Sequence, residues 1–104
     1  MSKQKLLDPI TPGEILREDF LEPLDISINQ LARDLSVPPN RISEIINGKR
    51  GMTPSTALRL EKYFGMSASF WLNLQLRWDL YFTQQAENEE LATISPHAMA
   101  DASG

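Results

Sequence analysis

The sequence predicts an all-α protein of five helices, and three observations support that prediction. Five positions combine a hydroxyl or proline start signal with apolar residues at the spacing of three and four that one face of an α-helix requires. No segment sustains the period-two alternation of a half-buried strand. The chain has no cysteine, so packing rather than disulfides or thiolate-bound metal must hold the helices together.

The first helix is expected to begin after Thr11, where a proline at the first helical position and a glutamate at the third complete a capping signal. Pro23 should force this helix to stop or bend near Leu21. Its buried side is predicted from apolar residues at a spacing of four, namely Leu16, Phe20 and Leu24.

A short second helix should follow Ser27, which is again a capping residue, and a third should begin at Pro39 after only a tight connection. The third helix is expected to end near Asn47, closed by Gly48. The buried residues predicted for the second helix lie at i, i+3, i+4 and i+7: Ile28, Leu31, Ala32 and Leu35.

The fourth helix should open at Thr53-Pro54 and end at Gly65, and Ser67 should cap a longer fifth helix over about residues 68–86. We expect residues 1–10 to form an arm, residues 11–86 the domain with its C-terminal helix, and residues 87–104 a tail that is partly disordered. In that tail, Leu91 and Ile94 are candidates to pack back on the domain as an extended strap.

The third helix is the candidate functional element, because it is amphipathic and follows a short helix and a tight turn. At 100° per residue its isoleucines, Ile42, Ile45 and Ile46, cluster on one side. The opposite stripe carries Asn40, Glu44 and Asn47, flanked by Arg41 and Ser43. Such side chains can read the edges of DNA bases: asparagine pairs with adenine, arginine with guanine, and glutamate accepts from cytosine.

Charge favours a nucleic-acid partner only locally. The chain has a net charge of −4, but residues 27–63 contain six cations and three acids. Five acids crowd the first helix and three more lie near residue 90. These acidic groups are either solvated faces or a surface for a basic partner protein.

Residues 27–49, SINQLARDLSVPPNRISEIINGK, resemble the helix-turn-helix of the lambda-repressor-like (Cro/C1, or xenobiotic-response-element) family. Two further motifs resemble the HigA group of addiction-module antidotes, also called virulence-associated protein I. They are Pro12-Gly13-Glu14-Ile15, and Leu72-Asn73-Leu74-Gln75 between Phe70-Trp71 and Trp78-Asp79-Leu80. The resemblance implies a homodimeric antitoxin that represses its own operon and neutralises a HigB-like ribonuclease toxin.

Carried over by position, the resemblance assigns base reading to Pro39, Asn40, Arg41, Ser43 and Glu44. It puts Gln30, Asn47, Lys49 and Arg50 near the phosphates. Two residues depart from the family pattern: Ser36 replaces a glycine of the turn, where a left-handed backbone costs about 1–2 kcal/mol, and Pro38 replaces a serine or threonine cap.

The fifth helix carries more apolar surface than one stripe facing a small core can hide. It is either a thoroughly buried central helix or part of a two-fold interface. A dimer would bring two recognition helices to half-sites about 34–36 Å apart on a palindromic operator. We expect Trp78 and Phe82 to be dimer contacts, and Glu18 and Glu22 of the first helix to contact the toxin.

The sequence offers no support for an enzyme, a cofactor or a metal site, since its single histidine, His97, lies in the expected tail. No apolar run is long enough for a membrane span or a signal-peptide core, so a cytoplasmic location is expected. Two alternatives stay open. One is a free-standing transcriptional regulator without a toxin partner, and the other is a protein-interaction module with vestigial DNA binding.

Overall fold

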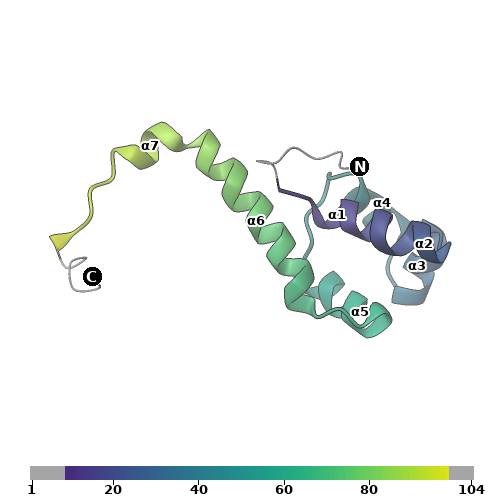
Figure 1. The fold of residues 1–104 in the computed structure, drawn as a ribbon. Helices are drawn as coiled ribbons and strands as arrows, with labels where there is room; N and C mark the ends of the chain where they lie inside the picture. Colours follow the sequence, from purple (N-terminus) through teal and green to yellow (C-terminus); the bar gives the residue numbers. More distant parts are fainter. Residues whose placement is uncertain (1–8, 99–104) are drawn as a thin grey trace.

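The computed structural model describes residues 9–98, and in that range every regular element is a helix (Figure 1). The first predicted helix is continuous but consists of α1 (Pro12–Ile15), the π-helical segment η1 (Leu16–Leu21) and α2 (Glu22–Leu24). The other elements are α3 (Ile28–Leu35), α4 (Pro39–Ile46), α5 (Pro54–Phe64), α6 (Ala68–Ala86) and α7 (Asn88–Ala92). The all-α prediction is confirmed: the five expected helices are present, and α7 is an additional one.

The helices begin where the sequence supplies side-chain caps. Thr11 and Glu14 form a reciprocal capping box, in which the Glu14 amide donates to Thr11 Oγ1 at 3.1 Å and the Thr11 amide donates to Glu14 Oε1 at 3.2 Å. Ser27, Thr53 and Ser67 each accept an amide hydrogen bond from the third residue of the helix that follows. Each cap satisfies a backbone donor that has no partner inside its helix, which fixes the start of the helix.

Of the two outcomes expected near Leu21, a stop or a bend, the helix does not stop. Its hydrogen bonds widen instead to the i→i−5 pattern, as in the Glu22 amide bonded to the Arg17 carbonyl, and the helix continues through Pro23 to Leu24. The widened turn places Leu21 rather than Leu24 on the buried side: Leu21 is 4% exposed and Leu24 is 55% exposed. The predicted burial of Leu24 is therefore wrong, because it assumed a regular spacing of four residues.

The core lies where α1, η1, α3, α4 and α5 meet the first half of α6. Trp71 of α6 is fully buried, and its ring lies 5.2 Å from that of Phe20, which in turn lies 4.8 Å from the ring of Phe64. The remaining fully buried large side chains are Leu16, Leu31, Ile42, Leu60 and Thr56. The packing of α3 and α4 on this core holds their outer faces at the surface.

The second half of α6 projects from the domain and leads into α7 (Figure 1). Leu91 is 42% exposed and Ile94 is 70% exposed, so the expected strap does not form. The reason is local, since residues 88–92 form a helical turn that leads away from the core instead of an extended segment that returns to it. In the part of the chain that the structure describes, no helix has both the length and the apolar character needed to cross a bilayer.

Candidate nucleic-acid interface

The connection between α3 and α4 is a tight turn built on Ser36, whose φ of 60° and ψ of 46° lie in the left-handed region. The Ser36 amide donates to the Arg33 carbonyl at 3.2 Å, and the Val37 amide donates to the Ala32 carbonyl at 3.0 Å. This is the Schellman pattern, which normally uses glycine. The left-handed backbone expected at this position is therefore confirmed, and a serine adopts it.

Helix α4 buries one face and exposes the other. Ile42, Ile45 and Ile46 are at most 9% exposed. Pro38 caps the helix without a side-chain hydrogen bond, as the absence of a hydroxyl there predicted. Because the isoleucines fix the rotation of the helix about its own axis, the polar stripe opposite them must face outward.

The five candidate base-reading residues all lie on that outer side. Pro39 and Asn40 are exposed, and Arg41, Ser43 and Glu44 are half-buried. The Ser43 hydroxyl donates to the Asn40 carbonyl at 3.3 Å. Their assignment to particular bases stays a prediction.

Glu44 and Arg50 are linked, which the sequence did not reveal. Arg50 Nε lies 2.8 Å from Glu44 Oε1, and the amides of Lys49 and Arg50 both donate to the Glu44 carbonyl, at 2.8 and 3.2 Å. An exposed ion pair of this kind adds at most about 1 kcal/mol of stability. Its effect here is geometric, because it ties the loop after α4 to the last turn of that helix.

The candidate phosphate contacts are accessible. Gln30 is exposed near the start of α3, and Asn47, Lys49 and Arg50 are exposed immediately after α4. Gly48, between them, has a φ of 77°, a conformation that glycine adopts without strain. Their contact with phosphate also stays a prediction.

Two side chains of α5 fasten the end of α3. Arg59 Nη1 donates to the Leu35 carbonyl at 2.9 Å, and the Tyr63 hydroxyl donates to Asp34 Oδ2 at 2.6 Å. The hydrogen bond to Asp34 raises the pKa of Tyr63 above its ordinary value of 10.0, and desolvation and the negative charge of Asp34 act in the same direction. Arg59, counted among the local cations, thus has a structural partner.

Helix α1 lies against α4 at the position of Gly13. A Cβ at residue 13 would lie 2.0 Å from the carbonyl oxygen of Ile45 and 2.8 Å from the Ile46 Cα, so the two backbones touch where no side chain fits. Glycine in the Pro12-Gly13-Glu14 motif is therefore a packing requirement.

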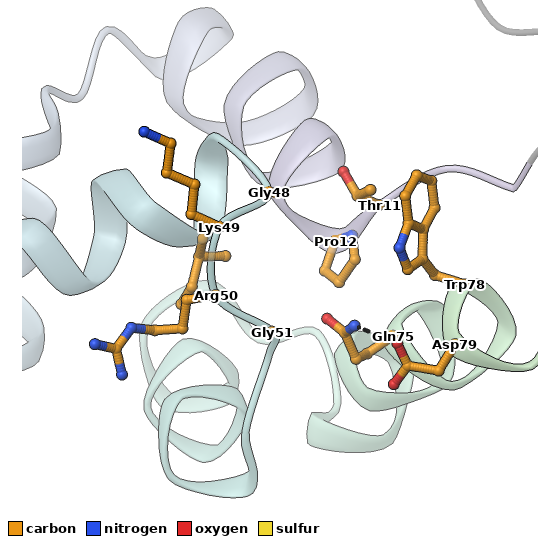
Figure 2. A pocket seen from close by; sticks show the side chains of 11 residues that line it. Thr11, Pro12, Gly48, Lys49, Arg50, Gly51, Gln75, Trp78 and Asp79 are labelled. Carbon is orange, nitrogen blue, oxygen red and sulfur yellow. Dashed lines mark hydrogen bonds between the residues drawn. The ribbon is translucent and has the colours of Figure 1, made fainter. Parts of the chain in front are cut away.

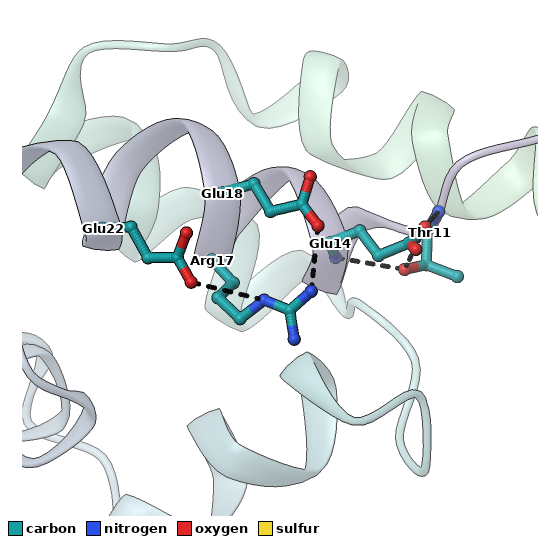
Figure 3. A network of polar contacts seen from close by, with 5 residues as sticks. All are labelled: Thr11, Glu14, Arg17, Glu18 and Glu22. Atoms are coloured by element: carbon teal, nitrogen blue, oxygen red, sulfur yellow. Dashed lines mark hydrogen bonds and ion pairs between the residues drawn. The ribbon is translucent and has the colours of Figure 1, made fainter. Parts of the chain in front are cut away.

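The acidic side of the first helix is partly neutralised by its own arginine (Figure 3). Arg17 Nη2 lies 2.9 Å from Glu18 Oε2, and Arg17 Nε lies 3.9 Å from Glu22 Oε2. Glu14, on the same helix, is occupied by its cap with Thr11. The two candidate toxin-contacting glutamates therefore share one guanidinium.

A cavity of about 220 Å³ lies between the loop after α4, the start of α1 and the middle of α6 (Figure 2). One wall is Gln75, which accepts the Met52 amide at 2.8 Å through Oε1 and donates to Asp79 Oδ1 at 3.0 Å through Nε2. Trp78 and Thr11 form another part of the lining. In the sequence, Gln75 and Asp79 were noted only as parts of a motif; the hydrogen bond between them and the bond from Met52 to Gln75 were missed.

The candidate dimer residues lie on the projecting half of α6. The Trp78 and Phe82 rings are 4.5 Å apart, Trp78 is half-buried and Phe82 is 38% exposed. Leu76 and Leu80 are more exposed, at 52% and 60%, and lie on the opposite side of the helix. From Leu76 to Phe82, α6 thus has two apolar faces, and the expected dimer contacts lie on only one of them.

None of the described residues form a group of three or more histidine, aspartate or glutamate side chains suited to hold a metal ion. The site consists instead of a short capped helix, a tight turn and a second helix with an open polar face, all mounted on a helical core. This arrangement defines the helix-turn-helix class of protein.

Comparison with known proteins identifies the group within this class. The Helix-turn-helix family matches residues 18–71, and Virulence-associated protein I of Dichelobacter nodosus is 51% identical over 84% of this chain and 80% of its own length. Antitoxin HigA-1 of Vibrio cholerae is 36% identical over 85% of this chain and 83% of its own. The solved structure of Pseudomonas aeruginosa antitoxin HigA with the higBA promoter is 42% identical, with a TM-score of 0.81 over 85% of this chain and 97% of that one. The chain belongs to the Helix-turn-helix family and, within it, to the group that contains HigA and virulence-associated protein I.

Proposed function

We propose that this chain is a cytoplasmic, dimeric, sequence-specific DNA-binding antitoxin. It represses its own operon by binding a palindromic operator, neutralises a HigB-like ribonuclease toxin, and has no enzymatic activity of its own. The observation that carries the proposal is α4, which turns three isoleucines inward and leaves Asn40, Arg41 and Glu44 on an open face. The similarity to a HigA antitoxin solved with its promoter supports it.

The first experiment identifies the operator. Genomic fragments selected by the purified protein should converge on a palindromic site in its own promoter. Replacing Asn40 and Arg41 together by alanine should then remove discrimination between operator and scrambled DNA, because each bidentate base contact is worth about 1–3 kcal/mol.

A matched control is available on α6, where Asn73 and Arg77 are exposed. The alanine variant of that pair loses the same chemical groups and should keep wild-type discrimination in a gel-shift titration. If the Asn40/Arg41 variant keeps it as well, α4 does not read the operator.

Dimerisation is assigned to Trp78 and Phe82. Phe82→Glu should shift the protein from dimer to monomer in sedimentation velocity and weaken operator binding, because one domain alone reads one half-site. Gln84→Glu, also exposed, is the charge control. A dimer that survives Phe82→Glu but dissociates with Leu80→Glu would move the interface to the Leu76/Leu80 face.

Toxin contact is assigned to Glu18 and Glu22. Reversing both charges to lysine should weaken the complex with the HigB-like protein in calorimetry. The double reversal of Glu89 and Glu90 on α7 makes the same change in net charge and should have no effect. Because reversal also removes the partners of Arg17, the neutral glutamine pair at 18 and 22 provides a milder second variant.

The order of neighbouring genes separates an antitoxin from a free-standing regulator. A small basic reading frame that resembles a ribonuclease, adjacent to this one, favours the antitoxin. If no such frame is present and no toxin is captured, the toxin part of the proposal fails while the DNA-binding part stands.

A further inference from the structure

Residues 48–52 of the loop between α4 and α5 are fastened at both ends. At its start, the amides of Lys49 and Arg50 donate to the Glu44 carbonyl and Arg50 pairs with the Glu44 carboxylate. At its end, the buried Met52 donates its amide hydrogen to Gln75 Oε1 at 2.8 Å. The second anchor comes from α6, 23 residues further along the chain.

Gln75 is itself held in one orientation. Its Nε2 donates to Asp79 Oδ1 at 3.0 Å, one helical turn later. A carboxylate can only accept hydrogen bonds, so the amide must present its nitrogen to Asp79 and its oxygen to the loop. The three groups therefore form a relay with a single direction: the Met52 amide donates to Gln75, and Gln75 donates to Asp79.

Gly51 allows the close approach that the relay needs. A Cβ at residue 51 would lie 3.2 Å from the side-chain amide carbon of Gln75. The side chains of Lys49 and Arg50 extend from the other side of the loop, away from Gln75 and Asp79 (Figure 2). The anchored side thus faces α6 and the cationic side faces solvent.

We propose that Gln75, oriented by Asp79, is a positioning residue for DNA binding. It holds residues 48–52 so that Lys49 and Arg50 meet the phosphates in register with α4. The inference rests on the proposed function and deepens it by naming a residue that acts on DNA binding indirectly. In this scheme Gln75 itself does not touch DNA. It also joins two surfaces, since the helix that carries Trp78 and Phe82 fixes the loop that meets the backbone of the duplex.

The test variant is Gln75→Leu, with Gln84→Leu on the exposed end of α6 as the matched control. Losing the hydrogen bond from the Met52 amide should change an equilibrium constant by about two- to tenfold. We expect operator affinity to fall by that factor for each subunit. The plot of log affinity against log salt should become shallower by up to about 2 per subunit, because each phosphate contact contributes roughly 0.9 to its slope. Discrimination between operator and scrambled DNA should stay close to wild type, since α4 keeps its base contacts.

A rescue variant separates the relay from general damage to the fold. Gln75→Glu alone sets two carboxylates against each other and should weaken binding as Gln75→Leu does. Adding Asp79→Asn reverses the first hydrogen bond: the new amide at position 79 would donate to the new carboxylate at position 75, which still accepts from Met52. The double variant should recover wild-type affinity and salt dependence, and failure to improve on Gln75→Glu would overturn the relay.

Hydrogen exchange of the Met52 amide tests the anchor without DNA. Exchange should be slow in the wild type and much faster in Gln75→Leu at a temperature where both are folded by circular dichroism. Unchanged exchange overturns the anchor, and faster exchange with unchanged salt dependence overturns its role in DNA binding. A wild-type protein that binds no operator refutes the proposed function, and the exchange result then still reports on the anchor separately.

Discussion

Replacing Gly13 by alanine is the sharpest test of how α1 packs on α4. The new Cβ would start 2.0 Å from the Ile45 carbonyl oxygen and 2.8 Å from the Ile46 Cα, and both are backbone atoms. To reach a normal van der Waals distance, the new Cβ and the Ile45 carbonyl oxygen must move apart by more than about 1 Å. No side-chain rotation can supply it, so one helix must move.

The magnitude follows from two opposing effects. Alanine is favoured over glycine inside a helix by about 1 kcal/mol. Overpacking costs typically about 1–3 kcal/mol, and a backbone-to-backbone clash belongs at the upper end. The expected net loss is about 2 kcal/mol, which lowers the unfolding midpoint by about 8–16 °C in a domain of this size.

The assay is thermal and urea unfolding followed by circular dichroism. Gly51→Ala is the matched control, because its new Cβ would meet only side-chain atoms of Gln75, at 3.2 Å, and no backbone, so it should cost less than about 1 kcal/mol. If Gly13→Ala is as stable as the wild type or more stable, helix propensity outweighs the clash. The close approach of α1 and α4 would then be no constraint on the fold.

Three further predictions concern single side chains. Ser36→Gly should raise stability by about 1 kcal/mol in urea unfolding, because glycine adopts the left-handed φ of 60° without the cost that serine bears; an unchanged midpoint would mean that the turn is unstrained. Ser27→Ala should lower stability by about 1 kcal/mol, since the Gln30 amide loses its cap, whereas Ser27→Asp should keep it. The phenol of Tyr63 should titrate above 10.0 in ultraviolet difference spectra and return toward that value in Asp34→Ala. Because the pKa of Tyr63 is raised by folding, the Asp34 contact stabilises the fold below pH 10 and is lost as the pH rises through the folded-state pKa.

Local signals in the sequence were enough to predict where the helices begin. A hydroxyl at Thr11, Ser27, Thr53 or Ser67 acts on an amide three residues away, so short-range chemistry decides the outcome. The inward face of α4 followed equally well from the 3.6-residue period. These features need no knowledge of the rest of the chain.

The first helix shows where such reasoning stops. A spacing of four through Leu16, Phe20 and Leu24 suggested one buried stripe, but the π-helical segment shifts the stripe and buries Leu21. The widened turn lies directly before Pro23, which has no amide hydrogen to donate. Which of several alternative hydrogen-bond patterns a helix adopts there depends on its packing against α4 and α6, and no local pattern contains that information.

The relay from Asp79 through Gln75 to Met52 was missed for a different reason. Its two ends are brought together by the fold, and the glutamine follows an ordinary run of α6 residues. Likewise, Glu44 and Arg50 were each assigned to DNA, although the loop brings them to within 2.8 Å of each other. Sequence patterns identify residue types on a face, while partners distant in the chain require the coordinates.

The projection of α6 beyond the domain separates two properties of an operator. Under the proposed function, α4 determines the base preference. In a dimer joined through α6, the distance between the two α4 helices depends on where along α6 the subunits meet. Moving the meeting point by one turn of α6 moves each contact about 5.4 Å along the helix. That length equals roughly one and a half base-pair steps of DNA. Half-site spacing could therefore diverge among relatives through changes in a few apolar positions of α6, while the sequence read within each half-site stays the same.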